Sequence, residues 1–86
     1  MSIASRIRDH MSVIGSDGRR IGFVTGLQGI DGLRLSQVKE GYGFEHLIPL
    51  AWVSDVDRYV FLNKSRAYVT ANWETAPGPH RRTRAA

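Results

Sequence analysis

The chain has 86 residues, which is enough for one small domain, and its hydrophobic (42%) and charged (23%) fractions exclude both a disordered chain and a membrane span. It contains no cysteine, which excludes disulfides, thiol catalysis and the common structural zinc sites. The formal net charge is +4, but three arginines near the C-terminus supply most of it, so the rest of the chain carries about +1.

The first ten residues are expected to form a loosely held arm. Ile3 and Ile7 lie four positions apart and favour one helical turn, but few other apolar residues accompany them. Arginines and an aspartate occupy this segment, where a signal peptide has an apolar stretch of roughly 7 to 15 residues. We therefore assign residues 1–10 to an arm and residues 11–74 to the folded domain, and we expect a cytoplasmic protein with no membrane segment.

Residues 11–27 predict a β-hairpin. One strand is expected from Met11 to Ile14, and a second runs back from Arg20 to Leu27. The turn between them contains Asp17-Gly18, a pair of the type that accepts positive φ and joins two antiparallel strands.

The glycines of this hairpin are interpreted as residues of backbone turns. The stretch from Gly15 to Arg20 matches neither the spacing of a P-loop nor that of a dinucleotide-binding loop, and a strand rather than a helix is expected after it. A bulge at Gly22 would bring Val24 to the same face as Ile21. We therefore expect no phosphate or nucleotide site here.

The middle of the chain predicts further short strands. Residues 33–36 alternate between apolar and polar and indicate a strand with one solvated face, after which residues 37–45 resemble a surface loop. Residues 46–50 resume extended structure, and Pro49 marks an edge or the end of pairing because it has no N–H. After a turn, residues 56–62 are predicted as the last strand, which makes five or six strands in all.

The end of the domain is predicted to be a short helix. Asn63 is a good N-cap for a helix over residues 64–73, in which Val69 and Trp73 lie four positions apart. Small and apolar residues also alternate over this segment, so a strand is the alternative. Residues 75–86 have no large apolar side chain and are predicted to be a disordered basic tail.

No residue pattern points to catalysis or metal binding. The three histidines lack the spacing of metal ligands, and Glu45-His46 is the only plausible acid/base pair. Asp55 and Asp57 share one side of a predicted strand next to solvent, where a structural role is favoured. We expect no enzyme, no cofactor and no metal.

Aromatic side chains are frequent in the second half of the domain. They could form a platform on which bases stack, but in so small a domain large side chains are needed for the core, which is the favoured interpretation. The residues concerned are Trp52, Tyr59, Phe61, Tyr68 and Trp73.

The order of these pieces resembles the PRC-barrel superfamily over residues 7–73. The pattern consists of Met11-x-Val13, Ser16-Asp17-Gly18, Ile21-Gly22-x-Val24, Leu33-x-Leu35, His46-x-Ile48-Pro49-Leu50-x-Trp52-Val53 and Val60-x-Leu62. Within the superfamily the chain is most similar to small stand-alone bacterial PRC-barrel-like proteins of unknown function. The resemblance implies a mainly β fold, a small and mostly antiparallel β-barrel, that serves as a docking module without catalytic residues.

The apolar positions predict which side chains lie inside such a barrel and which remain outside. The expected interior consists of Ile21, Val24, Leu35, Ile48, Leu50, Val60 and Leu62. Phe23, Tyr59 and Phe61 are left on the outer face, where a second copy of the chain would cover them, so we expect a homo-oligomer, most simply a dimer.

The sequence therefore predicts a non-catalytic binding or assembly module with a protein partner that it does not identify. The alternative is an RNA- or ribosome-associated protein that contacts phosphates through basic side chains. These candidate contacts are Arg19, Arg20, Arg81, Arg82 and Arg84.

Overall fold

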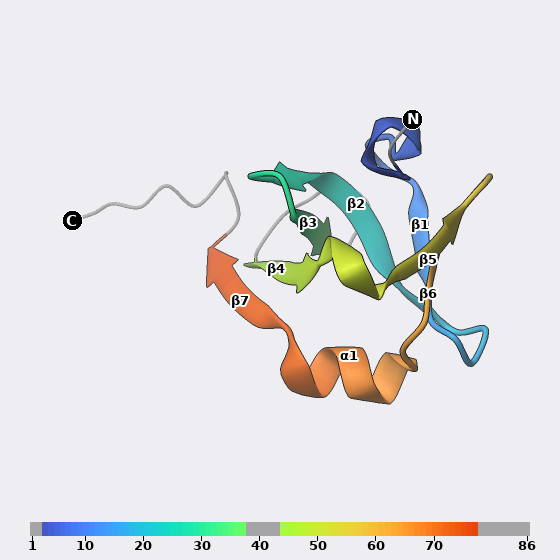
Figure 1. The fold of residues 1–86 in the computed structure, drawn as a ribbon. Helices are drawn as coiled ribbons and strands as arrows, with labels where there is room; N and C mark the ends of the chain where they lie inside the picture. The colour runs from blue at the N-terminus through green and yellow to red at the C-terminus, as the bar shows by residue number, and fades with distance from the viewer. Residues whose placement is uncertain (1–2, 38–43, 78–86) are drawn as a thin grey trace.

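Seven short strands form one mixed sheet in the computed structural model, which describes residues 3–37 and 44–77 (Figure 1). The strands are β1 (Ser12–Ile14), β2 (Arg20–Gln28), β3 (Gly32–Ser36), β4 (Phe44–Pro49), β5 (Val53–Val56), β6 (Val60–Leu62) and β7 (Glu74–Pro77). One α-helix, α1 (Arg66–Asn72), and two 3₁₀ turns, η1 (Ile3–Arg6) and η2 (Leu50–Trp52), complete the described elements. The prediction of a mainly β fold is confirmed.

The predicted closed barrel is wrong, because the sheet is open. Its strand order is β5-β6-β1-β2-β3-β4-β7, so β5 and β7 form its two edges. All neighbouring pairs are antiparallel except β1 and β6, which are parallel. The chain leaves β6 through α1 and returns at the opposite edge as β7, so that the helix lies between the two sides of the sheet (Figure 1). Val69 of α1 is fully buried and belongs to the core, so the helix packs on the sheet.

The predicted strand over residues 56–62 is two strands. Val56 pairs with Val60 across a tight turn, in which the backbone N–H of Asp57 donates to the carbonyl oxygen of Tyr59 at 3.0 Å. The polar residues at this turn are exposed, whereas both valines are buried. The structure therefore has seven strands in the described residues where five or six were predicted.

The core lies on the inner face of the curved sheet and against α1. It consists of Val13, Ile21, Val24, Leu33, Leu35, Ile48, Val53, Val56, Val60, Leu62 and Val69. Six of the seven predicted interior residues are in this set; Leu50 is only half-buried because it lies in η2.

The bulge predicted beside Gly22 is present. Val13 pairs with Gly22 and Ile14 with Arg20, so the intervening Ile21 is an extra residue in β2. This extra residue lets both Ile21 and Val24 reach the core, where they are 3% and 1% exposed.

The predicted hairpin turn is also confirmed. Gly18 has φ +82°, which favours glycine, and the backbone N–H of Gly18 donates to the carbonyl oxygen of Gly15 at 2.9 Å. β1 and β2 on either side of it pair antiparallel, and β2 is a strand as expected.

The helix is confirmed and the strand alternative is wrong, but the N-cap is Ser65 rather than Asn63. The Oγ of Ser65 accepts from the backbone N–H of Tyr68 at 3.1 Å. Asn63 instead donates through Nδ2 to the carbonyl oxygen of Ala51 at 3.2 Å, which ties the chain before the helix to η2.

Two strands extend into segments that were predicted to be a loop and a tail. β4 begins at Phe44, inside the predicted loop, and β7 continues to Pro77, inside the segment assigned to the tail. Residues 78–86 lie outside the described residues, as do residues 38–43 of the predicted loop. Ile3 and Ile7 of the arm pack against the core.

Candidate functional site

A groove of about 330 Å³ opens where the β2–β3 turn, the end of β4, η2 and the end of α1 meet. It is lined by Gln28, Asp31, Gly32, Leu47, Ile48, Pro49, Trp52, Asn72 and Glu74.

The β2–β3 turn forms one wall because it is tied to η2. The backbone N–H of Leu50 donates to the carbonyl oxygen of Asp31 at 2.7 Å. Gly32 pairs with Pro49, and a Cβ on Gly32 would lie 2.8 Å from the carbonyl oxygen of Gln28, so only glycine allows this close approach. These contacts place the Gln28 and Asp31 side chains at the groove.

Trp52 forms the opposite wall and is held in place. Its indole packs edge to face against the ring of Tyr68, with ring centroids 5.5 Å apart and planes at 69°. Its carbonyl oxygen accepts from the backbone N–H of Asn63 at 2.8 Å. Ile48, which is 2% exposed, supplies an apolar floor. The indole is therefore a pre-positioned surface for a ligand.

The rim of the groove is polar and acidic. Gln28, Asp31, Asn72 and Glu74 are all exposed, and among the described residues the lining contains two carboxylates and no cationic side chain. Within residues 3–37 and 44–77, neither Asp31 nor Glu74 forms an ion pair. Such a site offers hydrogen-bond acceptors and negative charge beside an aromatic ring.

Glu45 and His46 do not form the acid/base pair that their sequence positions suggested. They are consecutive residues of β4, so their side chains point to opposite faces of the sheet. Glu45 is 4% exposed, and its Oε1 lies 3.5 Å from Nη1 of Arg34.

His46 faces the start of β7 instead. Its Nδ1 lies 3.0 Å from the Oγ1 of Thr75, and its ring stacks on Trp73. Burial lowers the pKa of His46 from the usual 6.5, because the charged imidazolium would lose its water. Both residues of the suggested pair thus have structural contacts.

The remaining chemical candidates, Asp55 and Asp57, lie at the end of β5 and in the turn that follows it. Asp55 accepts through Oδ1 from the backbone N–H of Val56 at 2.9 Å, and Asp57 lies in the β5–β6 turn.

Among the described residues, no group of three or more histidines and carboxylates is placed to hold a metal ion. The described part of the chain also has no helix that is long and apolar enough to cross a membrane.

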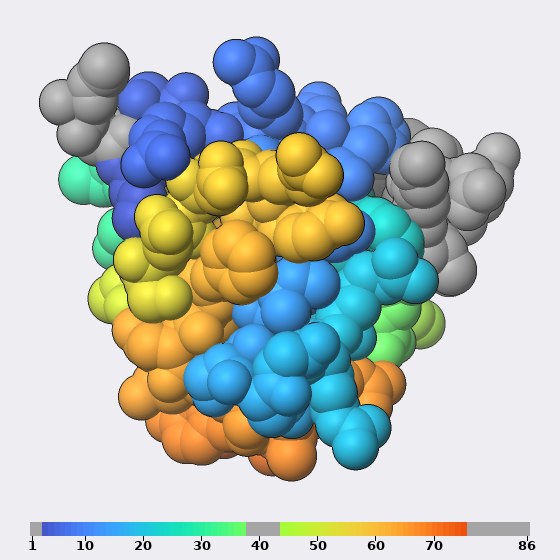
Figure 2. Space-filling model, turned by 90° about the vertical axis from the view of Figure 1, so that its right-hand side faces the viewer, coloured from blue at the N-terminus to red at the C-terminus, as the bar shows by residue number. Residues whose placement is uncertain are grey.

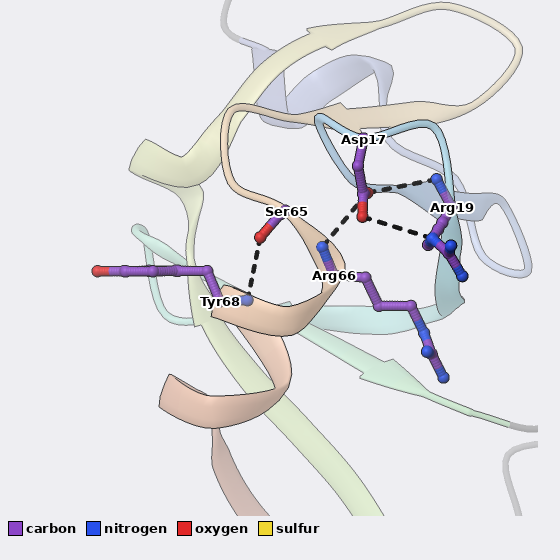
Figure 3. Close-up of polar contacts among 5 residues, drawn as sticks. All are labelled: Asp17, Arg19, Ser65, Arg66 and Tyr68. Atoms are coloured by element: carbon purple, nitrogen blue, oxygen red, sulfur yellow. Dashed lines mark hydrogen bonds and ion pairs between the residues drawn. The ribbon is translucent and has the colours of Figure 1, made fainter.

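The structure places the two predicted arginines of the hairpin in separate contacts. The Nε of Arg19 lies 3.8 Å from Oδ2 of Asp17, although the Arg19 side chain is 73% exposed (Figure 3). The guanidinium of Arg20 lies 5.0 Å from the centre of the Phe23 ring. Arg81, Arg82 and Arg84 lie outside the described residues.

The predicted apolar surface residues share one face of the sheet. Ser12 pairs with Phe23 and Ile14 with Phe61, and these residues alternate with the buried Val13 and Val60. Tyr59 packs edge to face on Phe61, with ring centroids 6.1 Å apart. Figure 2 shows this face, with β1 in blue between the yellow and orange β5–β6 hairpin and the cyan β2. We call Phe23, Tyr59 and Phe61, with Ile14 between them, the outer aromatic face.

The groove was not predicted from the sequence. Its lining comes from six separate elements, so no local spacing brings the residues together. The one available signal was Trp52, a large aromatic residue placed in a turn directly after a predicted strand.

Comparison with known proteins identifies the family of the chain. Residues 7–70 match a family described as uncharacterized protein conserved in bacteria (DUF2171). No curated protein and no solved structure matches the chain. Because the match covers most of the folded domain, the chain belongs to this conserved bacterial family, DUF2171.

Proposed function

We propose that this protein is a non-catalytic binding module that holds its ligand in the groove beside Trp52. The observation that carries the proposal is the indole of Trp52, held by Tyr68, in a groove whose exposed rim carries two amides and two carboxylates. Amides, carboxylates and an indole recognise a ligand through hydrogen bonds and stacking, and the exposed rim leaves the groove open to water. The docking role implied by the PRC-barrel resemblance agrees with this proposal.

Nuclear magnetic resonance with the full isotope-labelled chain tests it. A library of small neutral, cationic and anionic compounds should contain some that shift the resonances of the Trp52 indole and of the Asp31 and Asn72 amides. Trp52→Ala should abolish these shifts, whereas Tyr59→Ala, which removes an exposed ring from a different face, should leave them unchanged. The proposal fails if no compound perturbs the groove.

The outer aromatic face favours a second function, self-association. Tyr59 is 41% exposed, and its ring forms one apolar surface with Phe61. A second copy of the chain would bury this surface in a symmetric contact. We therefore propose that the module is a homodimer.

Light scattering at micromolar concentration tests the dimer. Tyr59→Glu should shift the mass from dimer to monomer because it would bury an unpaired charge. Ile30→Glu is the matched control, since Ile30 is 96% exposed in the β2–β3 turn, away from this face. A monomeric unmodified chain would exclude the dimer.

RNA association is the alternative role for the basic side chains. Arg19 is paired with Asp17 and Arg20 lies over Phe23, so the hairpin supports it weakly. RNA binding that survives deletion of residues 78–86 and weakens steeply with salt would favour the alternative over the groove. We expect no binding by that shortened chain, even at low salt.

A further inference from the structure

We infer that the groove binds an arginine side chain presented by a peptide. This inference rests on the proposed function and adds to it the chemical class of the ligand. The observation behind it is that two carboxylates, Asp31 and Glu74, line the groove together with the Trp52 indole, while the lining drawn from residues 3–37 and 44–77 includes no cationic side chain.

The negative charge of the groove favours a cationic ligand. Asp17 and Glu45 are each paired with an arginine within 4 Å, at 3.8 Å and 3.5 Å. Asp31 and Glu74 have no such partner within residues 3–37 and 44–77. Asp31 and Glu74 line the same groove, so one bound cation would offset both negative charges. A cation bound between them would gain charge-assisted hydrogen bonds.

The indole selects among cations. A cation is attracted to the face of an aromatic ring, and tryptophan is the strongest of the aromatic side chains in this respect. A guanidinium is planar and weakly hydrated, so it stacks on a ring while its N–H groups still reach carboxylates, which a compact ammonium does less well. The edge-to-face packing on Tyr68 holds the Trp52 ring ready for such stacking.

The size and the apolar floor favour a side chain carried by a peptide. A volume of about 330 Å³ lies at the lower end of the range for ligand sites, roughly 300 Å³ and above. Ile48 and Pro49 supply apolar surface for the methylene stem of an arginine. Gln28 and Asn72 lie at the exposed rim, where the Gln28 amide and the Oδ1 of Asn72 can bond the flanking peptide groups, since the Nδ2 of Asn72 donates to the carbonyl oxygen of Tyr68 at 2.8 Å.

Calorimetric titration of the full chain with three capped tripeptides tests the inference. The probes are acetyl-Gly-Arg-Gly-amide, the same peptide with citrulline in place of arginine, and the same peptide with lysine. Citrulline has nearly the shape of arginine without its charge. We expect the arginine peptide to bind at least about ten-fold more tightly than the citrulline peptide, a difference of about 1.4 kcal/mol, with lysine between them.

Variants locate the binding. Asp31→Asn and Glu74→Gln should each weaken the arginine peptide about five- to ten-fold, and Trp52→Ala should do so at least as strongly. Asp57→Asn removes an exposed carboxylate outside the groove and should leave the affinity unchanged. Circular dichroism of Asp31→Asn and Glu74→Gln should match that of the unmodified chain, because both carboxylates are exposed.

Four results would overturn the inference. Equal affinity for the citrulline and arginine peptides would show that the guanidinium charge is not recognised. Loss of binding in Asp57→Asn would show that the peptide binds outside the groove. Binding of free agmatine, an alkyl guanidinium, without binding of the arginine peptide would make the ligand a small molecule. Neutral compounds that bind the groove when the arginine peptide does not would contradict this inference while supporting the proposed function, so the two can fail separately.

Discussion

The imidazole of His46 lies flat against the indole of Trp73, with ring centroids 3.5 Å apart and ring planes within 6° of parallel. A second contact joins the Nδ1 of His46 to the Oγ1 of Thr75 at 3.0 Å. Both link β4 to the chain at the start of β7, the edge strand that pairs with β4. The attachment of this edge strand, and with it Glu74 at the groove, therefore depends on a titratable side chain.

We predict that the protein loses stability as the pH falls below about 6.5. Burial lowers the pKa of folded His46 below its unfolded value of 6.5, so the unfolded chain binds more protons in the window between the two. The stabilising contribution is complete above pH 6.5 and is lost as the pH falls through the folded pKa. Urea denaturation at about pH 7.5 and about pH 5.5 measures the change, away from the usual carboxylate range. His46→Gln should flatten the dependence of the free energy of unfolding on pH. If this variant loses as much stability between the two pH values as the unmodified chain, another group causes the dependence.

Arg34 and Glu45 should be energetically coupled. The Glu45 side chain is 6% exposed and the Arg34 side chain is 37% exposed. Arg34→Met therefore leaves the buried Glu45 carboxylate without this partner, and water reaches the carboxylate only in part. We expect a loss of about 1–3 kcal/mol in the free energy of unfolding, at the low end because the pair is partly solvated. In the double variant with Glu45→Gln the loss should be smaller than the sum of the single losses. Additive losses would show that the two side chains do not interact.

Asp17 should stabilise α1 from a distance of 49 residues in the sequence. Its Oδ1 accepts from the backbone N–H of Arg66 at 3.3 Å, which joins the β1–β2 turn to the first residue of the helix (Figure 3). Asp17→Ala should cost about 1 kcal/mol, as should removal of the N-cap in Ser65→Ala. Asp17→Asn keeps a side-chain oxygen and should cost less. Hydrogen exchange of the α1 amides is the direct measurement, and equal protection in Asp17→Ala and the unmodified chain would contradict the prediction.

Gly22 should tolerate no side chain. A Cβ there would lie 2.5 Å from the carbonyl oxygen of Ser36 and 2.9 Å from Cδ1 of Leu35, so Gly22→Ala must push β2 away from β3. We expect a loss of about 2 kcal/mol or more in thermal or urea unfolding. Gly18→Asn is the matched control, since no atom lies within 4 Å of the added Cβ and asparagine tolerates positive φ. The prediction is wrong if the two variants are equally stable.

Thr25→Val should stabilise the protein. The Oγ1 of Thr25 is buried and has no hydrogen-bond partner among the described residues, so replacing the hydroxyl by a methyl group removes an unsatisfied polar atom. The expected gain is about 0.5–1.5 kcal/mol. Thr70→Val is the control, because the Thr70 hydroxyl donates to the carbonyl oxygen of Ala67 at 3.3 Å and its loss should not stabilise. Chemical denaturation of both variants measures the two changes in the free energy of unfolding, and a Thr25→Val variant that is no more stable than the unmodified chain would contradict the prediction.

Local chemistry accounts for the parts of the fold that were predicted correctly. Asp17-Gly18 predicted the first turn because a positive φ has a local residue signature, and Gly18 has φ +82°. The bulge beside Gly22 followed from the need to bury both Ile21 and Val24. The helix at Val69 followed from capping residues and spacing, although the cap was displaced by two residues to Ser65.

The sequence by itself determined the β1–β2 turn, the helix and six of the eleven core side chains, because each depends on neighbours within a few residues. Only the tertiary structure decided that the sheet stays open, since whether β7 joins β4 or another strand depends on contacts between distant segments. The same holds for the groove, whose carboxylates at positions 31 and 74 are separated by 43 residues and meet only because α1 returns the chain to the far edge of the sheet. Pairing between distant strands has no short-range signature, so it cannot be derived from alternation and turn residues alone.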